Sequence, residues 1–188
     1  DLTKVDRSSE IEMIYTTPSH QFPLGMIMPI SRRRELLSFA EAYNSFILED
    51  DYDSELRYYQ RPIPALKSID YLGRVIYLGT FSKILSPSFR MGYMVLTEQF
   101  TESFLEKFKL YNSTVNLLNQ IALANILSSG DYDRLVCKMN HVFKKRYEAF
   151  KKEFEQFNAP IKLSSNVSGQ YFLVTFPDKI NQCDVIKR

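Results

Sequence analysis

The sequence predicts an α/β fold with a mainly parallel sheet. Short apolar runs at residues 46–48 and 75–78 are separated by longer segments with helical spacing. The runs are continuously apolar rather than alternating, which is typical of parallel strands buried on both faces. Strands that alternate with helices are joined by crossover connections, and such connections produce parallel pairs. We therefore expect a sheet that is covered on both faces.

The first half of the chain contains four predicted strands, at residues 11–15, 46–48, 75–78 and 93–96. Between the first two strands, Ser31 can cap a helix because its hydroxyl can accept from a free backbone amide. The apolar residues of this helix recur every three or four positions and form one face, which consists of Leu36, Leu37, Ala40 and Tyr43. Prolines and a glycine mark residues 17–25 as a loop.

The second half is predicted to be mostly helical, with helices at residues 98–111, 114–127 and 131–157. The last would be about 40 Å long at about 1.5 Å per residue, which suits a helix that bridges two domains. A further strand is expected at residues 170–176, and residues 183–188 have the pattern of a helix that begins. We predict part of a large domain over residues 1–130. Residues 131–188 would form an interdomain helix and the start of a small α+β domain.

Composition restricts the classes of protein to consider. The net charge is +2, from 24 basic and 22 acidic residues, so charge alone gives no case for a nucleic-acid surface. Two distant cysteines form no disulfide framework, and no apolar run reaches the roughly 18 residues of a membrane span. A reducing, cytoplasmic location without a membrane is expected.

No metal site is expected. The acidic run at residues 49–55 lacks the glycine and glutamate that a calcium loop requires at its sixth and twelfth positions. Asp51, Asp53 and Glu55 are instead interpreted as polar loop groups or partners of Arg57. His20 and His141 form no ligand cluster, and a structural hydrogen bond is at least as good an interpretation of His20.

Reactive side chains follow two of the predicted strands. They are Asp50 and Tyr52 after one strand, and Thr80, Ser82 and Lys83 after the other, with Arg90 a short loop later. Ligands of open α/β sheets bind outside the carboxyl ends of the strands. A site for pyridoxal phosphate (PLP) needs a lysine for a Schiff base and an acid that keeps the pyridine nitrogen protonated. Hydroxyl groups and an arginine suit its phosphate.

Four motifs resemble one family. They are residues 17–25 (TPSHQFPLG), 49–55 (EDDYDSE), 79–83 (GTFSK) and 90–93 (RMGY). In order and spacing they resemble the MocR subfamily of GntR-type transcriptional regulators. Such proteins join a winged helix-turn-helix to a domain that resembles fold-type I aminotransferases. The resemblance covers nearly the whole chain and implies the large domain of a PLP-dependent transferase.

The resemblance also implies a role for each reactive residue. Lys83 matches the Schiff-base lysine, Asp50 the acid on the pyridine nitrogen, and Tyr52 the tyrosine on the ring hydroxyl; Thr80, Ser82 and Arg90 match phosphate-binding positions. Phe22 stands where ordinary aminotransferases carry an asparagine, and this favours the regulators. The structural alternatives are a solvated Lys83, an Asp50 that caps a loop, a packed Tyr52, an ion-paired Arg90, and turn roles for Thr80 and Ser82.

Two functions follow from the resemblance. The first is a PLP-binding, effector-sensing domain that responds to an amino-containing small molecule. The regulator would be a homodimer at full length and would bind DNA only through a domain absent from this chain. The alternative is a catalytically active class I/II aminotransferase that acts on an amino acid, with Lys83 as the general base. A third possibility is a vestigial site in a domain that only dimerises.

Overall fold

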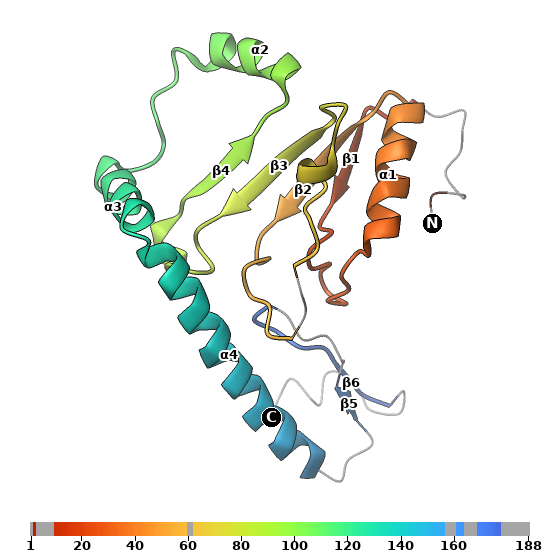
Figure 1. Cartoon of the computed structure of the whole chain (residues 1–188), viewed down its shortest axis with the longest axis vertical. Helices are drawn as coiled ribbons and strands as arrows, with labels where there is room; N and C mark the ends of the chain where they lie inside the picture. The colour runs from red at the N-terminus through yellow and green to blue at the C-terminus, as the bar shows by residue number, and fades with distance from the viewer. Residues whose placement is uncertain (1, 3–9, 60–61, 157–160, 164–168, 178–188) are drawn as a thin grey trace.

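Four strands form one sheet in the order β1-β2-β3-β4 (Figure 1). The computed structural model describes residue 2 and residues 10–59, 62–156, 161–163 and 169–177. The strands are β1 (Met13–Thr16), β2 (Phe46–Asp51), β3 (Val75–Thr80) and β4 (Gly92–Val95). β1, β2 and β3 run parallel, and β4 pairs antiparallel with β3. The predicted α/β fold with a mainly parallel sheet is confirmed.

The predicted helices are present, with shifted ends. They are α1 (Ile30–Ala42), α2 (Glu98–Phe108), α3 (Leu117–Ser128) and α4 (Asp131–Gln156), with short 3₁₀ turns η2 (Lys67–Ile69) and η3 (Pro87–Phe89). The expected cap of the first helix is wrong. Pro29 occupies the N-cap position in an extended conformation, and no side chain caps the helix. A proline at this position fixes the backbone that enters the helix without a side-chain acceptor.

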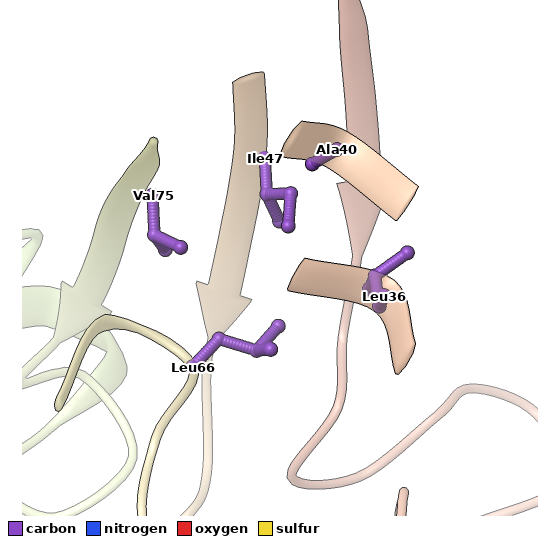
Figure 2. Close-up of a cluster of buried hydrophobic side chains, with 5 residues drawn as sticks. All are labelled: Leu36, Ala40, Ile47, Leu66 and Val75. Atoms are coloured by element: carbon purple, nitrogen blue, oxygen red, sulfur yellow. The ribbon is translucent and has the colours of Figure 1, made fainter. Parts of the chain in front are cut away.

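α1 packs its apolar face on the sheet, as Figure 2 shows. Leu36 and Ala40 of α1, Ile47 of β2, Val75 of β3 and Leu66 of the connecting loop are all buried in one cluster. The spacing of four between Leu36 and Ala40 puts both on the same side of the helix. Truncating Leu36 to alanine would cost roughly 2–5 kcal/mol, because the cavity only partly collapses.

A buried arginine joins α1 to the loops around it. Arg33 is fully buried and donates to the backbone carbonyls of Met28, Pro18 and Pro64 at 2.8–3.0 Å. Its guanidinium also lies 3.8 Å from the buried carboxylate of Glu49. A buried charge is tolerated only when its donors are satisfied, so Arg33 holds these loops in one arrangement.

The expected burial of the sheet on both faces is wrong for the described residues. Tyr93, Met94 and Val95 of β4 are each about 41–42% exposed, and Tyr15 of β1 is 61% exposed. β2 alternates between buried and half-buried positions. α2 and α3 lie beyond β4 rather than over the sheet (Figure 1). An apolar run shows what a strand can bury, whereas the covering elements are set by the rest of the fold.

α4 is a single helix of 26 residues, which is about 39 Å at 1.5 Å per residue. It leads to a two-stranded sheet of β5 (Lys162–Leu163) and β6 (Val174–Thr175). The strand predicted at residues 170–176 is therefore much shorter. The end of the long helix at residue 157 and the helix expected at 183–188 lie outside the described residues. Among the described helices, none is long and apolar enough to cross a membrane.

Candidate functional site

Strand register brings the two predicted groups of reactive residues to one edge of the sheet. Asp50 lies opposite Leu78, and Asp51 lies opposite Gly79, at the carboxyl ends of the parallel strands β2 and β3. Side chains alternate along a strand, so Asp50 points to the opposite face from its buried neighbour Asp51. Lys83 follows the end of β3, the strand that pairs with β2 at Asp50 and Asp51.

One oxygen atom of the Asp50 carboxylate accepts a hydrogen bond within the protein. Its Oδ2 accepts a hydrogen bond of 2.6 Å from the hydroxyl of Tyr15, at the end of β1. This hydrogen bond, with lesser effects of burial and of the carboxylate charge, raises the pKa of Tyr15. Among the described residues, none donates to Oδ1 of Asp50. Sequence reasoning missed Tyr15, because only the parallel pairing of β1 with β2 reveals the contact.

The acidic residues after Asp50 bind partners from distant segments. Asp51 is buried and accepts from the Tyr77 hydroxyl at 2.8 Å. Asp53 is buried against His20, with 2.7 Å between Oδ2 and Nδ1. Of the two roles expected for these acids, polar loop groups or partners of Arg57, the second is not found for Asp51 and Asp53 among the described residues. The structural role for His20 is confirmed by this buried bond.

Tyr52 is held by two oxygen atoms. Its hydroxyl donates to the His20 backbone carbonyl at 2.5 Å and lies 3.3 Å from the Tyr171 hydroxyl. Burial is the main cause that raises the pKa of Tyr52, and the contact with Tyr171 adds to it. The phenol therefore stays protonated at neutral pH.

The residues after β3 form a hairpin with β4. The Phe81 amide donates to the Met91 carbonyl at 3.0 Å. Thr80 Oγ1 donates to the same carbonyl at 3.2 Å and accepts from the Ser82 amide at 3.2 Å. The Thr80 hydroxyl therefore stabilises the turn, which is the structural role considered for it as an alternative to phosphate binding. Ser82 follows Phe81 and Arg90 precedes Met91, so the bond between Phe81 and Met91 brings together the two segments that carry Ser82 and Arg90.

Three side chains of this hairpin have no partner in the part of the chain that the structure describes. Among the described residues, none forms a hydrogen bond or ion pair with the Ser82 hydroxyl, the Lys83 ammonium or the Arg90 guanidinium. Lys83 and Ser82 are half-buried, whereas Arg90 is exposed and adopts a left-handed conformation, with φ 48°. Free cationic and hydroxyl donors after β3, with the carboxylate of Asp50 on the neighbouring strand β2, suit a ligand with a phosphate and a basic ring nitrogen. The residues present therefore fit PLP.

The fold and this arrangement define an aminotransferase-like α/β domain. The chain belongs to the aminotransferase class I and II family, whose pattern matches residues 2–183. Members of this family are typically PLP-dependent. The predicted fold-type I architecture is confirmed by a solved relative, kynurenine aminotransferase of Pyrococcus horikoshii in complex with PMP, KYN and KYA. It aligns with a TM-score of 0.84 and 31% identity, over 96% of this chain and 45% of that one.

Curated relatives include transcriptional regulators. The uncharacterized HTH-type transcriptional regulator YhdI of Bacillus subtilis is 47% identical over 135 residues, which are 72% of this chain and 29% of that protein. The probable rhizopine catabolism regulatory protein MocR of Rhizobium meliloti is 40% identical over 138 residues, or 73% and 28%. The resemblance to MocR-type regulators is confirmed. The chain spans less than a third of the length of either regulator.

Proposed function

We propose that this chain is the PLP-binding, effector-sensing domain of a transcriptional regulator, with PLP held as a Schiff base on Lys83. The observation that carries the proposal is the half-buried Lys83 ammonium, which lacks a partner among the described residues and follows the strand beside Asp50. The similarity to YhdI and MocR supports the regulatory reading over the enzymatic one.

Each residue of the site has a task that its surroundings support. Asp50 would hold the ring nitrogen in its protonated form through the free Oδ1, while Tyr15 keeps the carboxylate in place. The phenol oxygen of Tyr52, whose own proton is donated to the His20 carbonyl, would accept a hydrogen bond from the ring hydroxyl. Ser82 and Arg90 would bind the phosphate, with Thr80 orienting the turn beneath it. When bound, PLP supplies an electrophilic carbon for amines and a ring that withdraws electrons.

The effector is expected to be an amino-containing small molecule, because a primary amine can exchange with the amine of Lys83. Such a molecule can switch the regulator only if it binds the two states with different affinities. The full-length protein is expected to be a homodimer that contacts DNA through a further domain.

The proposal is tested by trapping the bound cofactor. The chain and the full-length protein are incubated with PLP, reduced with borohydride and digested, and the labelled peptide is mapped by mass spectrometry. We expect one label, on Lys83, which Lys83→Ala abolishes. Labels scattered over surface lysines in the full-length protein would show that Lys83 is not the site.

A catalytically active aminotransferase is the second candidate, favoured by the 31% identity to kynurenine aminotransferase. In that case Lys83 would also move a proton at the substrate carbon. Amino-acid-dependent turnover by the full-length protein, lost in Lys83→Ala, would establish the enzyme. Cofactor labelling without turnover would favour the sensor.

A further inference from the structure

Three consecutive residues after the long helix contact three different parts of the candidate site. The Gly169 amide donates to the Leu56 carbonyl at 2.9 Å, in the loop that follows Asp53. Gln170 Nε2 lies 3.4 Å from the carbonyl oxygen of Lys83. These residues, together with Tyr171, are called the clasp segment below (residues 169–171).

Tyr171 contacts the side of the site that carries the phenol. Its hydroxyl lies 3.3 Å from the Tyr52 hydroxyl and 3.4 Å from the Gln21 carbonyl oxygen. Its ring stacks on the His20 ring, with 4.8 Å between the centroids and 19° between the planes. The clasp segment therefore contacts both Tyr52 and the backbone of Lys83, which are 31 positions apart in the sequence.

A buried pair forms the surface on which the clasp segment rests. His20 and Asp53 are only 2% and 3% exposed, and Nδ1 of His20 lies 2.7 Å from Oδ2 of Asp53. Nε2 of His20 is also buried, and none of the described residues forms a hydrogen bond with it. A buried polar pair of this kind is costly to maintain, and its contact with the clasp segment gives it a task beyond filling space.

Gly169 lies so close to this pair that no side chain fits. A Cβ at residue 169 would lie 2.3 Å from Cε1 of His20 and 2.6 Å from Oδ2 of Asp53. The backbone also adopts a φ of +77°, which favours glycine. The hydroxyl of Tyr58 donates to the Gly169 carbonyl. Both backbone polar groups of Gly169 are therefore bonded to the loop that follows Asp53.

We propose that the clasp segment couples the cofactor site to the C-terminal part of the chain, with Gly169 and Tyr171 as positioning residues for Tyr52 and Lys83. The inference rests on the proposed function, because it takes Lys83 and Tyr52 as cofactor residues. Linkage requires the coupling to be reciprocal. A clasp segment held in place strengthens PLP binding, and bound PLP slows the opening of the clasp segment.

Gly169→Ala is the decisive variant, because the added methyl pushes on both His20 and Asp53. Gly73→Ala and Gly130→Ala are matched controls, since both glycines have a positive φ (+67° and +73°) and open space where a Cβ would lie. PLP affinity is measured by titration of the visible absorbance band. Amide hydrogen exchange is followed over residues 169–176 and 81–91, with and without PLP.

We expect Gly169→Ala to weaken PLP binding at least about tenfold and to speed exchange in both segments, while the two controls leave both quantities unchanged. Tyr171→Phe keeps the stacked ring and removes only the hydroxyl, so a loss of about three- to tenfold is expected from one hydrogen bond. The proposed coupling would be wrong if Gly169→Ala and Tyr171→Phe both kept the wild-type PLP affinity and exchange became faster only at residues 169–176.

The two proposals fail in different ways. If borohydride reduction does not label Lys83 in the wild-type protein, the proposed function is wrong. The exchange measurement without PLP would still decide whether the clasp segment controls the backbone around Lys83. Faster exchange at residues 81–91 in Gly169→Ala, absent from Gly73→Ala, supports the coupling; unchanged exchange there refutes it.

Discussion

The carboxyl ends of β2 and β3 lie side by side in the sheet but differ in how their polar side chains are bonded. At the end of β2 and just beyond it, Asp51 and Asp53 are buried and bonded to Tyr77 and His20, respectively. After β3, the side chains of Ser82, Lys83 and Arg90 have no partner among the described residues. Asp51 and Asp53 are therefore bonded within the protein, whereas the end of β3 presents free donors.

This difference indicates that the acids at the end of β2 stabilise the fold, whereas the free side chains after β3 bind the ligand. Hydrogen bonds within the protein fix the acidic loop before any ligand arrives, so that Asp50 and Tyr52 are already placed. The free donors remain available to bind an anion, and hydrogen bonds between a fixed cation and an anion are stronger than those between neutral groups. If so, substitutions after β2 should reduce the stability of the fold, and substitutions after β3 should reduce ligand binding alone.

Among substitutions at the two strand ends, the largest loss of stability is expected from Asp53→Ala. Removal of this carboxylate leaves the buried His20 Nδ1 without its partner, which should lower the free energy of unfolding by about 2–3 kcal/mol. Urea denaturation measures the change. Asp50→Ala is the matched control, because its one hydrogen bond within the described part of the chain is to the exposed Tyr15, and a loss below about 1 kcal/mol is expected. Equal losses in the two variants would contradict this difference in roles.

A smaller loss is expected from Tyr77→Phe. The change removes the hydroxyl that donates to the buried Asp51 and should cost about 1 kcal/mol, while the Ser54 amide still donates to this carboxylate. Tyr71→Phe is the control, since Tyr71 is 94% exposed. The same denaturation experiment compares the two. A Tyr77→Phe protein as stable as the control would show that the Asp51 carboxylate does not need this donor.

Sequence patterns predicted the elements well and the contacts poorly. Apolar runs located the four strands, and strand ends grouped Asp50 with Lys83, because register follows from parallel pairing. The bond between His20 and Asp53 joins residues 33 positions apart in two loops, and no periodicity encodes it. Tyr15 was assigned only to a strand, since its contact with Asp50 depends on which strand is its neighbour.

An alkaline titration tests the loop that follows Asp53 and its contact with the clasp segment. Burial, reinforced by the charge of Asp53, raises the pKa of Tyr58 to about 12. Its folded pKa exceeds the usual value near 10, so the stability it contributes is complete below pH 10 and is lost as pH rises toward 12. The absorbance of ionised tyrosine is followed against pH in the wild type and in Tyr58→Phe. The difference between the two curves should have its midpoint near pH 12. A midpoint near 10 would place Tyr58 in water.

The smallest effect on stability is expected from Lys83→Ala and Arg90→Ala. Neither side chain has a partner among the described residues, so each change should alter the free energy of unfolding by less than about 0.5 kcal/mol. Relief from the left-handed φ at Arg90 is expected in Arg90→Gly rather than in the alanine variant. Against this near-neutral background, PLP labelling should vanish in Lys83→Ala, and PLP affinity should fall about tenfold or more in Arg90→Ala, because a phosphate loses a charge-assisted bond. A large loss of stability in Lys83→Ala would instead assign the lysine a structural role, and the contrast between the two strand ends would disappear.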